Sequence, residues 1–146
     1  MFPHYLSRLT YSVVQFAGSI IEATALGERV LRGVSLPDGD VRIIVDQLID
    51  NALCGYAFTS LPRILAIAQD AKTQQARQPV RVVHETPVSA LLDGGNNVGY
   101  VAVYRTTQVA IDKARAQRFA AVGVYNSYYS GRNAYYMEMV RRESAR

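Results

Sequence analysis

The residues best suited to binding chemistry lie in the segment 124–136, VYNSYYSGRNAYY, which follows an apolar run at residues 120–124. Its binding groups are two hydroxyls, a glycine and a fixed positive charge: Ser127, Ser130, Gly131 and Arg132. We predict that a strand ends at Val124 and that a helix begins just after Gly131. A helix N-terminus offers free N–H groups and the positive end of a dipole, so the turn is suited to an anion such as a nucleotide phosphate. An ordinary turn, in which Asn and Ser bond locally, is the more common explanation of such a segment.

A second turn between a strand and a helix is predicted in the segment 91–105, LLDGGNNVGYVAVYR. It matches neither GxGxxG nor the P-loop, because no second and third glycine fall at the required spacing and no lysine follows a glycine. A turn with a helix N-cap is again the more common explanation. The chain has one cysteine and two histidines, which excludes a disulfide scaffold and leaves no expected metal site.

The composition is that of one globular domain. Of 146 residues, 49% are hydrophobic and 19% are charged, which suffices for a core. The net charge is +4, but the basic residues are spread along the chain, so we expect anionic small molecules rather than nucleic acid as ligands. The single cysteine, Cys54, and the lack of a CxxC motif favour a reducing cytoplasm. We expect Cys54 to be buried or half-buried, and His84, in a predicted strand, to be structural.

The first 22 residues are expected to lie outside the domain. They contain Arg8 and an apolar middle, and an Ala-x-Ala sequence follows at residues 23–25, which together resemble a secretory signal peptide. Gln15 and Glu22 interrupt the apolar region, so a leader, or a start codon upstream of the true domain, is the favoured explanation. No run of the sequence is long and apolar enough to predict a membrane span.

The spacing of apolar residues predicts helices first and then strands alternating with helices. In the first half we expect helices at residues 23–32, 41–53 and 60–72, with Asp38 or Asp40 capping the second and Ser60 the third. In the second half we expect a hairpin of strands at 80–85 and 89–93, a turn at 94–97, a helix at 98–117, a buried strand at 119–124 and a helix at 133–142. The predicted fold class is α/β, with an N-terminal helical segment followed by a small α/β unit.

Two motifs in this order resemble those of the malate/L-lactate dehydrogenase family, which does not use a Rossmann domain. The family's DGxNxxG turn before a long helix resembles residues 93–99, and its VxNSxHxGxxxYY motif at a strand end resembles residues 124–136. Upstream, ALCGYAFTSLPRI resembles LxRGxxSHGxxRLPR and ends in Leu61, Pro62 and Arg63. VVHETPVSALLDG resembles the family's VVRETPATALVDG. The resemblance covers residues 23–139.

The resemblance implies a homodimeric NAD(P)-dependent oxidoreductase that acts on 2-hydroxy or 2-oxo acids. It implies that Arg63 binds the substrate and that NAD or NADP is held by the turn residues Asn126, Ser127, Tyr129, Ser130, Gly131 and Arg132. It also divides the chain into a leader or extra segment (1–22), a helical dimerisation segment (23–75) and an α/β cofactor-side segment (76–146).

Three departures from the family pattern bear on activity. The window of the family's catalytic histidine holds Tyr56, Ala57, Phe58 and Thr59, so we expect no catalytic residue, with the Tyr56 phenol a poor substitute. The histidine of NSxH is Tyr129 here, and family members are much longer. We therefore expect a truncated member with little activity alone. A non-catalytic dimerisation or binding module derived from the family is the alternative, and an RNA-binding domain is disfavoured by the lack of a positive stripe.

Overall fold

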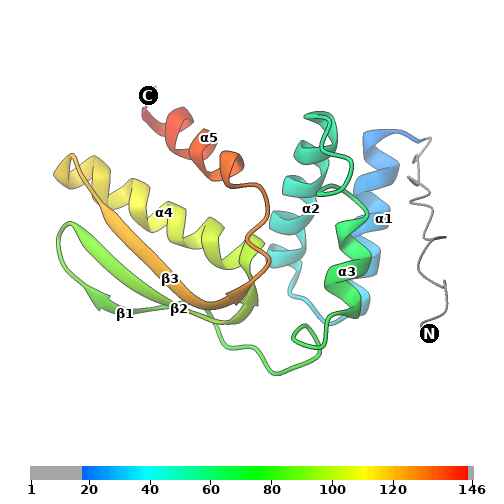
Figure 1. The fold of residues 1–146 in the computed structure, drawn as a ribbon, viewed down its shortest axis with the longest axis horizontal. Coiled ribbons are helices and arrows are strands. Elements are labelled where there is room, and N and C mark those ends of the chain that lie inside the picture. Colours follow the sequence, from blue (N-terminus) through cyan, green and yellow to red (C-terminus); the bar gives the residue numbers. More distant parts are fainter. Residues whose placement is uncertain (1–17, 145–146) are drawn as a thin grey trace, which may run out of the picture.

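The structure, a computed structural model, describes residues 18–144 and places three helices beside a mixed three-stranded sheet (Figure 1). The expectations for residues 1–17 lie outside this described part. Helices α1–α3 gather at one end of the molecule, and the sheet forms the other end with α4 and α5 (Figure 1). The predicted fold class is confirmed. The elements are α1 (Ile20–Gly33), α2 (Asp38–Leu53), α3 (Arg63–Gln69), β1 (Arg81–Glu85), β2 (Ser89–Val98), α4 (Gly99–Gln117), β3 (Ala121–Tyr128) and α5 (Asn133–Ser144).

The first two helices begin in different ways. α1 begins earlier than predicted because Ser19 and Glu22 form a capping box, in which each side chain accepts a hydrogen bond from the other residue's amide. α2 begins after Pro37, and no side chain caps it. The predicted cap by Asp38 or Asp40 is therefore wrong. Both residues lie in the first turn of α2 instead, where their charges face the positive end of the helix dipole.

The buried face of α2 forms the centre of the core, as its apolar spacing predicts. Its side chains Val41, Ile44, Val45 and Leu48 are fully buried, and they pack with residues of α1, α3 and the first turn of α4. α2 ends at Leu53, and Cys54 after it is exposed, so the expectation of a buried or half-buried thiol is wrong. The cysteine comes after Asn51, the last buried residue of α2, so it lies beyond the part of the helix that faces the core.

α3 is shorter than predicted at both ends, and its start differs because Ser60 does not cap it. It spans Arg63–Gln69, with Pro62 at the N-cap position. The Ser60 hydroxyl, predicted to cap this helix, donates to the Ala57 carbonyl at 2.8 Å instead. Ser60 thus closes the loop between α2 and α3, and the start of α3 depends on proline geometry.

The sheet has the order β1-β2-β3, with β1 antiparallel and β3 parallel to β2. The predicted hairpin is confirmed, but the predicted turn at residues 94–97 lies within β2, where the pairing with β3 shifts register between Asp93 and Asn97. β3 is not the buried strand expected, because exposed and half-buried residues alternate along it and it continues to Tyr128. The cause is that α4 covers one face of the sheet, with α5 on the far side of α4 (Figure 1).

Within residues 18–144, none of the helices combines the length and the hydropathy that a membrane span requires.

Candidate functional site

The two predicted turns lie side by side where the parallel strands β2 and β3 end. Asp93 pairs with Tyr125, and beyond the register shift Asn97 pairs with Ser127. β2 leads directly into α4, and β3 leads into α5 through the residues 129–132. Ligands of open α/β sheets bind outside the carboxyl ends of the strands, so this edge is the candidate site.

The first turn, residues 93–99, uses its polar side chains to hold backbone. Asp93 accepts hydrogen bonds from the Gly95 amide at 2.9 Å and from the Asn126 side chain at 2.8 Å, and these bonds hold the pKa of Asp93 below its usual value. Asn97 donates to the carbonyl oxygens of Gln78 and Gly94, at 2.6 and 2.8 Å. These side chains therefore act as a scaffold.

Two glycines of the first turn are required by close backbone approach. A Cβ atom at Gly94 would lie 2.8 Å from the carbonyl oxygens of Tyr125 and Asn126. A Cβ atom at Gly95 would lie 2.2 Å from the carbonyl oxygen of Gln78, and Gly95 also has a φ of +60°. The glycine pair thus lets β2 approach both β3 and the segment before β1.

The second turn, residues 126–132, concentrates unusual backbone conformations. Asn126, Tyr129 and Gly131 have φ values of +54°, +55° and +77°. Asparagine and glycine adopt this left-handed region readily, whereas a bulky residue such as Tyr129 is strained there. Strained residues persist where the surroundings hold them, and they cluster at ligand sites. The turn is therefore a stronger candidate than its composition indicated.

The predicted cofactor residues differ in what they contact. Asn126 is bound to Asp93, and the nearby Asp70 carboxylate raises the pKa of the Tyr129 hydroxyl. The hydroxyls of Ser127 and Ser130 have no hydrogen-bond partner within residues 18–144. Two unused hydroxyls thus lie on the turn, together with the backbone of Gly131.

Arg132 is not the free cation that the sequence suggested. Its guanidinium donates to Asn51 at 2.7 Å and to Glu138 at 3.1 Å, and it also donates to Asp50. Its side chain is only 11% exposed, and its Cζ atom lies 5.5 Å from the centre of the Tyr56 ring. Arg132 therefore ties the start of α5 to the end of α2, and two carboxylates balance its charge. Its role as a cofactor ligand stays a prediction.

Arg63, the predicted substrate residue, lies close to the same turn. Its Cζ atom is 4.7 Å from the centre of the Phe58 ring and 5.5 Å from that of Tyr129. The side chain is half-buried, and no carboxylate within residues 18–144 pairs with it. The structure thus brings the predicted substrate residue and the predicted cofactor turn together, although 66 positions separate Arg63 from Tyr129 in the sequence.

The window of the family's catalytic histidine is the loop between α2 and α3. It holds Tyr56, which is 50% exposed, and Phe58, which is 64% exposed, and no imidazole. His84 lies on β1, exposed and paired with Leu91. Within the described part of the chain, no three His, Cys, Asp or Glu side chains gather in a way that could hold a metal ion.

Sequence reasoning missed three residues that shape the site: Asp50, Asp70 and Tyr136. Asp50 binds Arg132 from 82 positions away, and Asp70, in the loop after α3, raises the pKa of Tyr129. The buried Tyr136 donates from α5 to the Ser130 carbonyl at 2.5 Å. Only the paired tyrosines of the YY motif gave any signal, because they fell inside the quoted segment.

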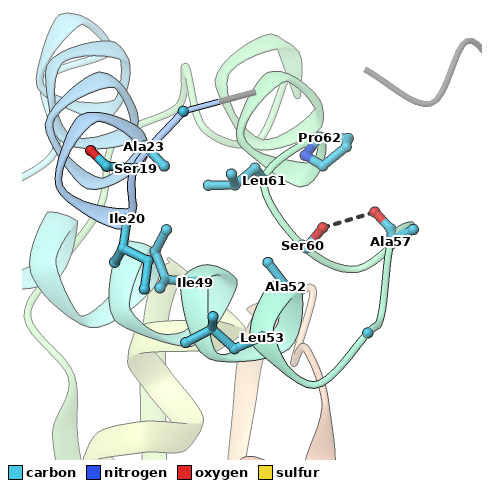
Figure 2. Close-up of a pocket in the computed structure, with 12 residues that line it drawn as sticks. Ser19, Ile20, Ala23, Ile49, Ala52, Leu53, Ala57, Ser60, Leu61 and Pro62 are labelled. Atoms are coloured by element: carbon cyan, nitrogen blue, oxygen red, sulfur yellow. Dashed lines mark hydrogen bonds between the residues drawn. The ribbon is translucent and has the colours of Figure 1, made fainter. Parts of the chain in front are cut away.

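An apolar hollow of about 360 Å³ lies away from this edge, between α1, the end of α2 and the loop before α3 (Figure 2). Figure 2 shows the side chains of Ile20, Ile49 and Leu61 around it. The Ser60 hydroxyl at its rim is already bonded to Ala57. A second apolar hollow, of about 300 Å³, lies between α1 and α3. Neither has an ionisable group to do chemistry, so they are candidates for contact with apolar side chains.

Comparison with known proteins places most of this chain in one family. The family model described as malate/L-lactate dehydrogenase matches residues 19–145. The L-sulfolactate dehydrogenase of Methanothermobacter thermautotrophicus is 28% identical over 120 residues, which cover 81% of this chain and 35% of that protein. The malate dehydrogenase of Pyrococcus abyssi is 31% identical over 117 residues, which cover 79% and 32%.

Two solved structures that superimpose on this chain are also malate dehydrogenases. The malate dehydrogenase of Pyrococcus horikoshii superimposes with a TM-score of 0.77 at 29% identity, covering 82% of this chain and 35% of that one. That of Entamoeba histolytica gives 0.78 at 27% identity, covering 86% and 36%. The chain spans about a third of the length of these relatives. With the family model matching most of its residues, this chain belongs to the malate/L-lactate dehydrogenase family.

Proposed function

We propose that this chain provides the cofactor turn and the carboxylate-binding arginine of an NAD(P)-dependent oxidoreductase for 2-hydroxy or 2-oxo acids, and lacks a proton donor of its own. The observation that carries the proposal is Arg63. It is a half-buried guanidinium without a carboxylate partner in residues 18–144, and it lies against Tyr129 of the turn.

The chemistry of Arg63 suits the carboxylate of such an acid. Ring contacts with Phe58 and Tyr129 hold the guanidinium in place without using up its charge. A guanidinium presents N–H donors in a rigid fork that matches a carboxylate, and such charged hydrogen bonds are short and strong. A 2-oxo acid bound there would lie beside the turn that we assign to the cofactor.

The turn supports the cofactor assignment through its unused groups. The hydroxyls of Ser127 and Ser130 are available for a ribose or phosphate oxygen, and Gly131 allows a ligand to approach its backbone closely. Arg132 supports the assignment less than its charge suggested, because Asp50 and Glu138 already pair with it. The choice between NAD and NADP is left to the binding experiment.

Little turnover is expected from the chain alone. Hydride transfer to a 2-oxo acid needs a proton donor near the carbonyl, and an imidazole is well matched to neutral pH. Tyr129 lies beside Arg63, and the neighbouring Asp70 carboxylate raises the pKa of this phenol further from neutrality. Robust oxidation of malate, lactate or another 2-hydroxy acid would show that this expectation is wrong.

Binding measurements on Arg63→Gln test the proposal. Calorimetric titration with oxaloacetate and pyruvate, with and without NADH or NADPH, should show saturable binding to the parent. Arg63→Gln should weaken the acid about 10- to 100-fold, because it removes a charged hydrogen bond. Arg29→Gln, at an exposed position of α1, is the control and should match the parent. No binding at millimolar ligand, or equal binding by Arg63→Gln, would contradict the proposal.

The alternative function, a non-catalytic dimerisation module, is favoured by the apolar surface of the helices. Ile20, which lines the first hollow, is 54% exposed, and Leu65, which lines the second, is 59% exposed. Neighbouring exposed apolar side chains mark protein interfaces. We therefore assign the homodimer contact to this surface in either function.

The dimer is tested by light scattering at micromolar concentration. The parent should have twice the chain mass of 16.2 kDa. Leu65→Glu should give a monomer that keeps its helical signal, since the side chain is already exposed. Leu91→Glu, at a 42% exposed position on the sheet, is the matched control and should remain dimeric. A monomeric parent would contradict the assignment without affecting the binding proposal.

The remaining parts of the proposal are the location and the partners. A single free thiol and the intracellular chemistry of nicotinamide cofactors support the cytoplasm. Small acids and a second copy of the chain are the proposed partners, and nucleic acid and membrane are not among them.

A further inference from the structure

The second turn is held in place from inside the molecule by three contacts. The backbone of Ser130 lies against Gly99, where a Cβ atom would come within 2.8 Å of the Ser130 backbone. Gly131 lies on the ring of Tyr100, where a Cβ atom would come within 2.7 Å of a ring carbon. The third contact is the hydrogen bond from the Tyr136 hydroxyl to the Ser130 carbonyl, at 2.5 Å. The first two contacts limit how closely the turn can approach α4. Only the third, a hydrogen bond, fixes the orientation of the Ser130 carbonyl group.

The Tyr136 hydroxyl lies at the junction of three helices and the turn. The residue is 5% exposed, and its hydroxyl is also 3.5 Å from the Gly99 carbonyl at the start of α4. Burial raises the pKa of Tyr136 and outweighs the opposing effect of the nearby Gln47 amide of α2. The phenol therefore keeps its proton at neutral pH and acts as a donor. Gln47 itself donates to the Tyr100 carbonyl at 2.9 Å, whereas its side-chain oxygen has no partner within residues 18–144.

We infer that Tyr136 is the positioning residue of the proposed cofactor turn: its hydroxyl fixes the Ser130 carbonyl and so sets the direction of the Ser130 hydroxyl and the Gly131 amide. The inference rests on the proposed function, because it matters for activity only if the turn binds cofactor. It explains why a buried phenol, rather than an apolar ring, fills this place on α5. This hydrogen bond is partly buried, and leaving its acceptor without the donor costs free energy, so the turn prefers the bonded geometry.

Tyr135 provides a matched control for Tyr136. The two residues are neighbours on α5, their rings contact each other edge to face at 5.9 Å, and both are at least half-buried. Within residues 18–144 the Tyr135 hydroxyl has no hydrogen-bond partner. Tyr135→Phe thus removes the same atom from the same helix without touching the turn.

The test compares Tyr136→Phe, Tyr135→Phe and the parent well below their melting temperatures. Two quantities are measured: the dissociation constants of NADH and NADPH, and the backbone amide signals of residues 126–132 in ¹⁵N spectra. We expect Tyr136→Phe to weaken the cofactor about fivefold or more, the effect of one lost hydrogen bond, and to shift or broaden the signals of the turn. Signals of β1 should not move, and Tyr135→Phe should behave as the parent.

The outcomes separate this inference from the proposed function. Unchanged turn signals in Tyr136→Phe would overturn the inference, as would changes spread evenly over the whole chain, which would indicate a general structural role. If the parent binds neither NADH nor NADPH, the proposed function fails and Tyr136 has no cofactor turn to position. If the parent binds and Tyr136→Phe binds equally well, the inference fails and the proposed function stands.

Discussion

The two turns at the carboxyl end of the sheet look alike in sequence but are built differently. The first, residues 93–99, packs backbone against backbone, and its Asp and Asn side chains are bonded to neighbouring segments. The second, residues 126–132, packs on the ring of Tyr100 as well as on the backbone of Gly99, and two of its hydroxyls have no partner in the described part of the chain. The first motif is therefore a scaffold, and the second, with its unused groups, is the turn that we propose to face the ligand.

The largest effect is expected from Gly95→Ala in the first turn. The new Cβ atom would meet the Gln78 carbonyl oxygen, and alanine would have to adopt a φ of +60°. We expect the free energy of unfolding to fall by about 4 kcal/mol, at the upper end for single substitutions. Urea denaturation measures it, with Gly33→Ala as control because nothing lies within 4 Å of its Cβ position. Equal stability of the two variants would contradict the scaffold role of the first turn.

Gly131→Val in the second turn should lower the free energy of unfolding by less, about 3 kcal/mol, because an aromatic side chain can move aside more easily than a backbone carbonyl. A glycine needed only for contact with the ligand would give lost nucleotide binding with little change in melting temperature. The φ of +77° and the ring of Tyr100 now predict a loss of stability as well. A melting temperature equal to that of the parent would show that the turn adapts, and would return Gly131 to a purely ligand-facing role.

Arg132→Ala tests whether the charge of Arg132 stabilises the fold or binds a ligand. Its removal leaves Asp50 and Glu138 without their partner at the contact between α2 and α5. Since both carboxylates are partly exposed, we expect about 2 kcal/mol of destabilisation, below the range for fully buried pairs. Thermal unfolding of Arg132→Ala is compared with that of Arg141→Ala, which removes an exposed arginine from the same helix. A stable Arg132→Ala variant with lost NADH affinity would instead support the original phosphate role.

The acid stability of the chain should depend on Asp93. Its hydrogen bonds from Gly95 and Asn126 lower its pKa in the folded state, so the ionised form stabilises the fold above the ordinary pKa of an aspartate. That contribution is lost as the pH falls through the folded-state pKa, in a window from about pH 4 downwards. Asp93→Asn should therefore show a smaller decrease in melting temperature on acidification than the parent. Asp112→Asn, at an exposed helix position, is the control, and its melting temperature should decrease on acidification as much as that of the parent.

The smallest effect on stability is expected from Ser127→Ala and Ser130→Ala. Neither hydroxyl bonds to the described part of the chain, so the free energy of unfolding should change by less than about 0.5 kcal/mol. If the second turn faces the cofactor, the double variant should nevertheless lose NADH or NADPH affinity in a fluorescence titration. Unchanged affinity with unchanged stability would make both turns scaffolds, and the comparison between them would no longer hold.

Local chemistry explains which elements the sequence predicted well. The apolar spacing of α2 and α4 is a property of the helix itself, so both were located within two or three residues. The caps were predicted less well. Asp38, Asp40 and Ser60 each had a suitable side chain, but proline geometry and the loop contact of Ser60 decided where the helices begin. Which residue caps a helix depends on the path of the chain before the helix, and a local sequence pattern does not predict that path.

The sequence by itself determined the order of the elements, the family, and the absence of a histidine in the catalytic window, because these depend on residue types and spacing alone. Only the tertiary structure decided which charges are free. Arg132 looked available and is paired with Asp50 and Glu138, whereas Arg63 has ring neighbours and no carboxylate in the described chain. Pairing acts over a few ångströms in space, between residues up to 82 positions apart in sequence, and folding alone brings them together.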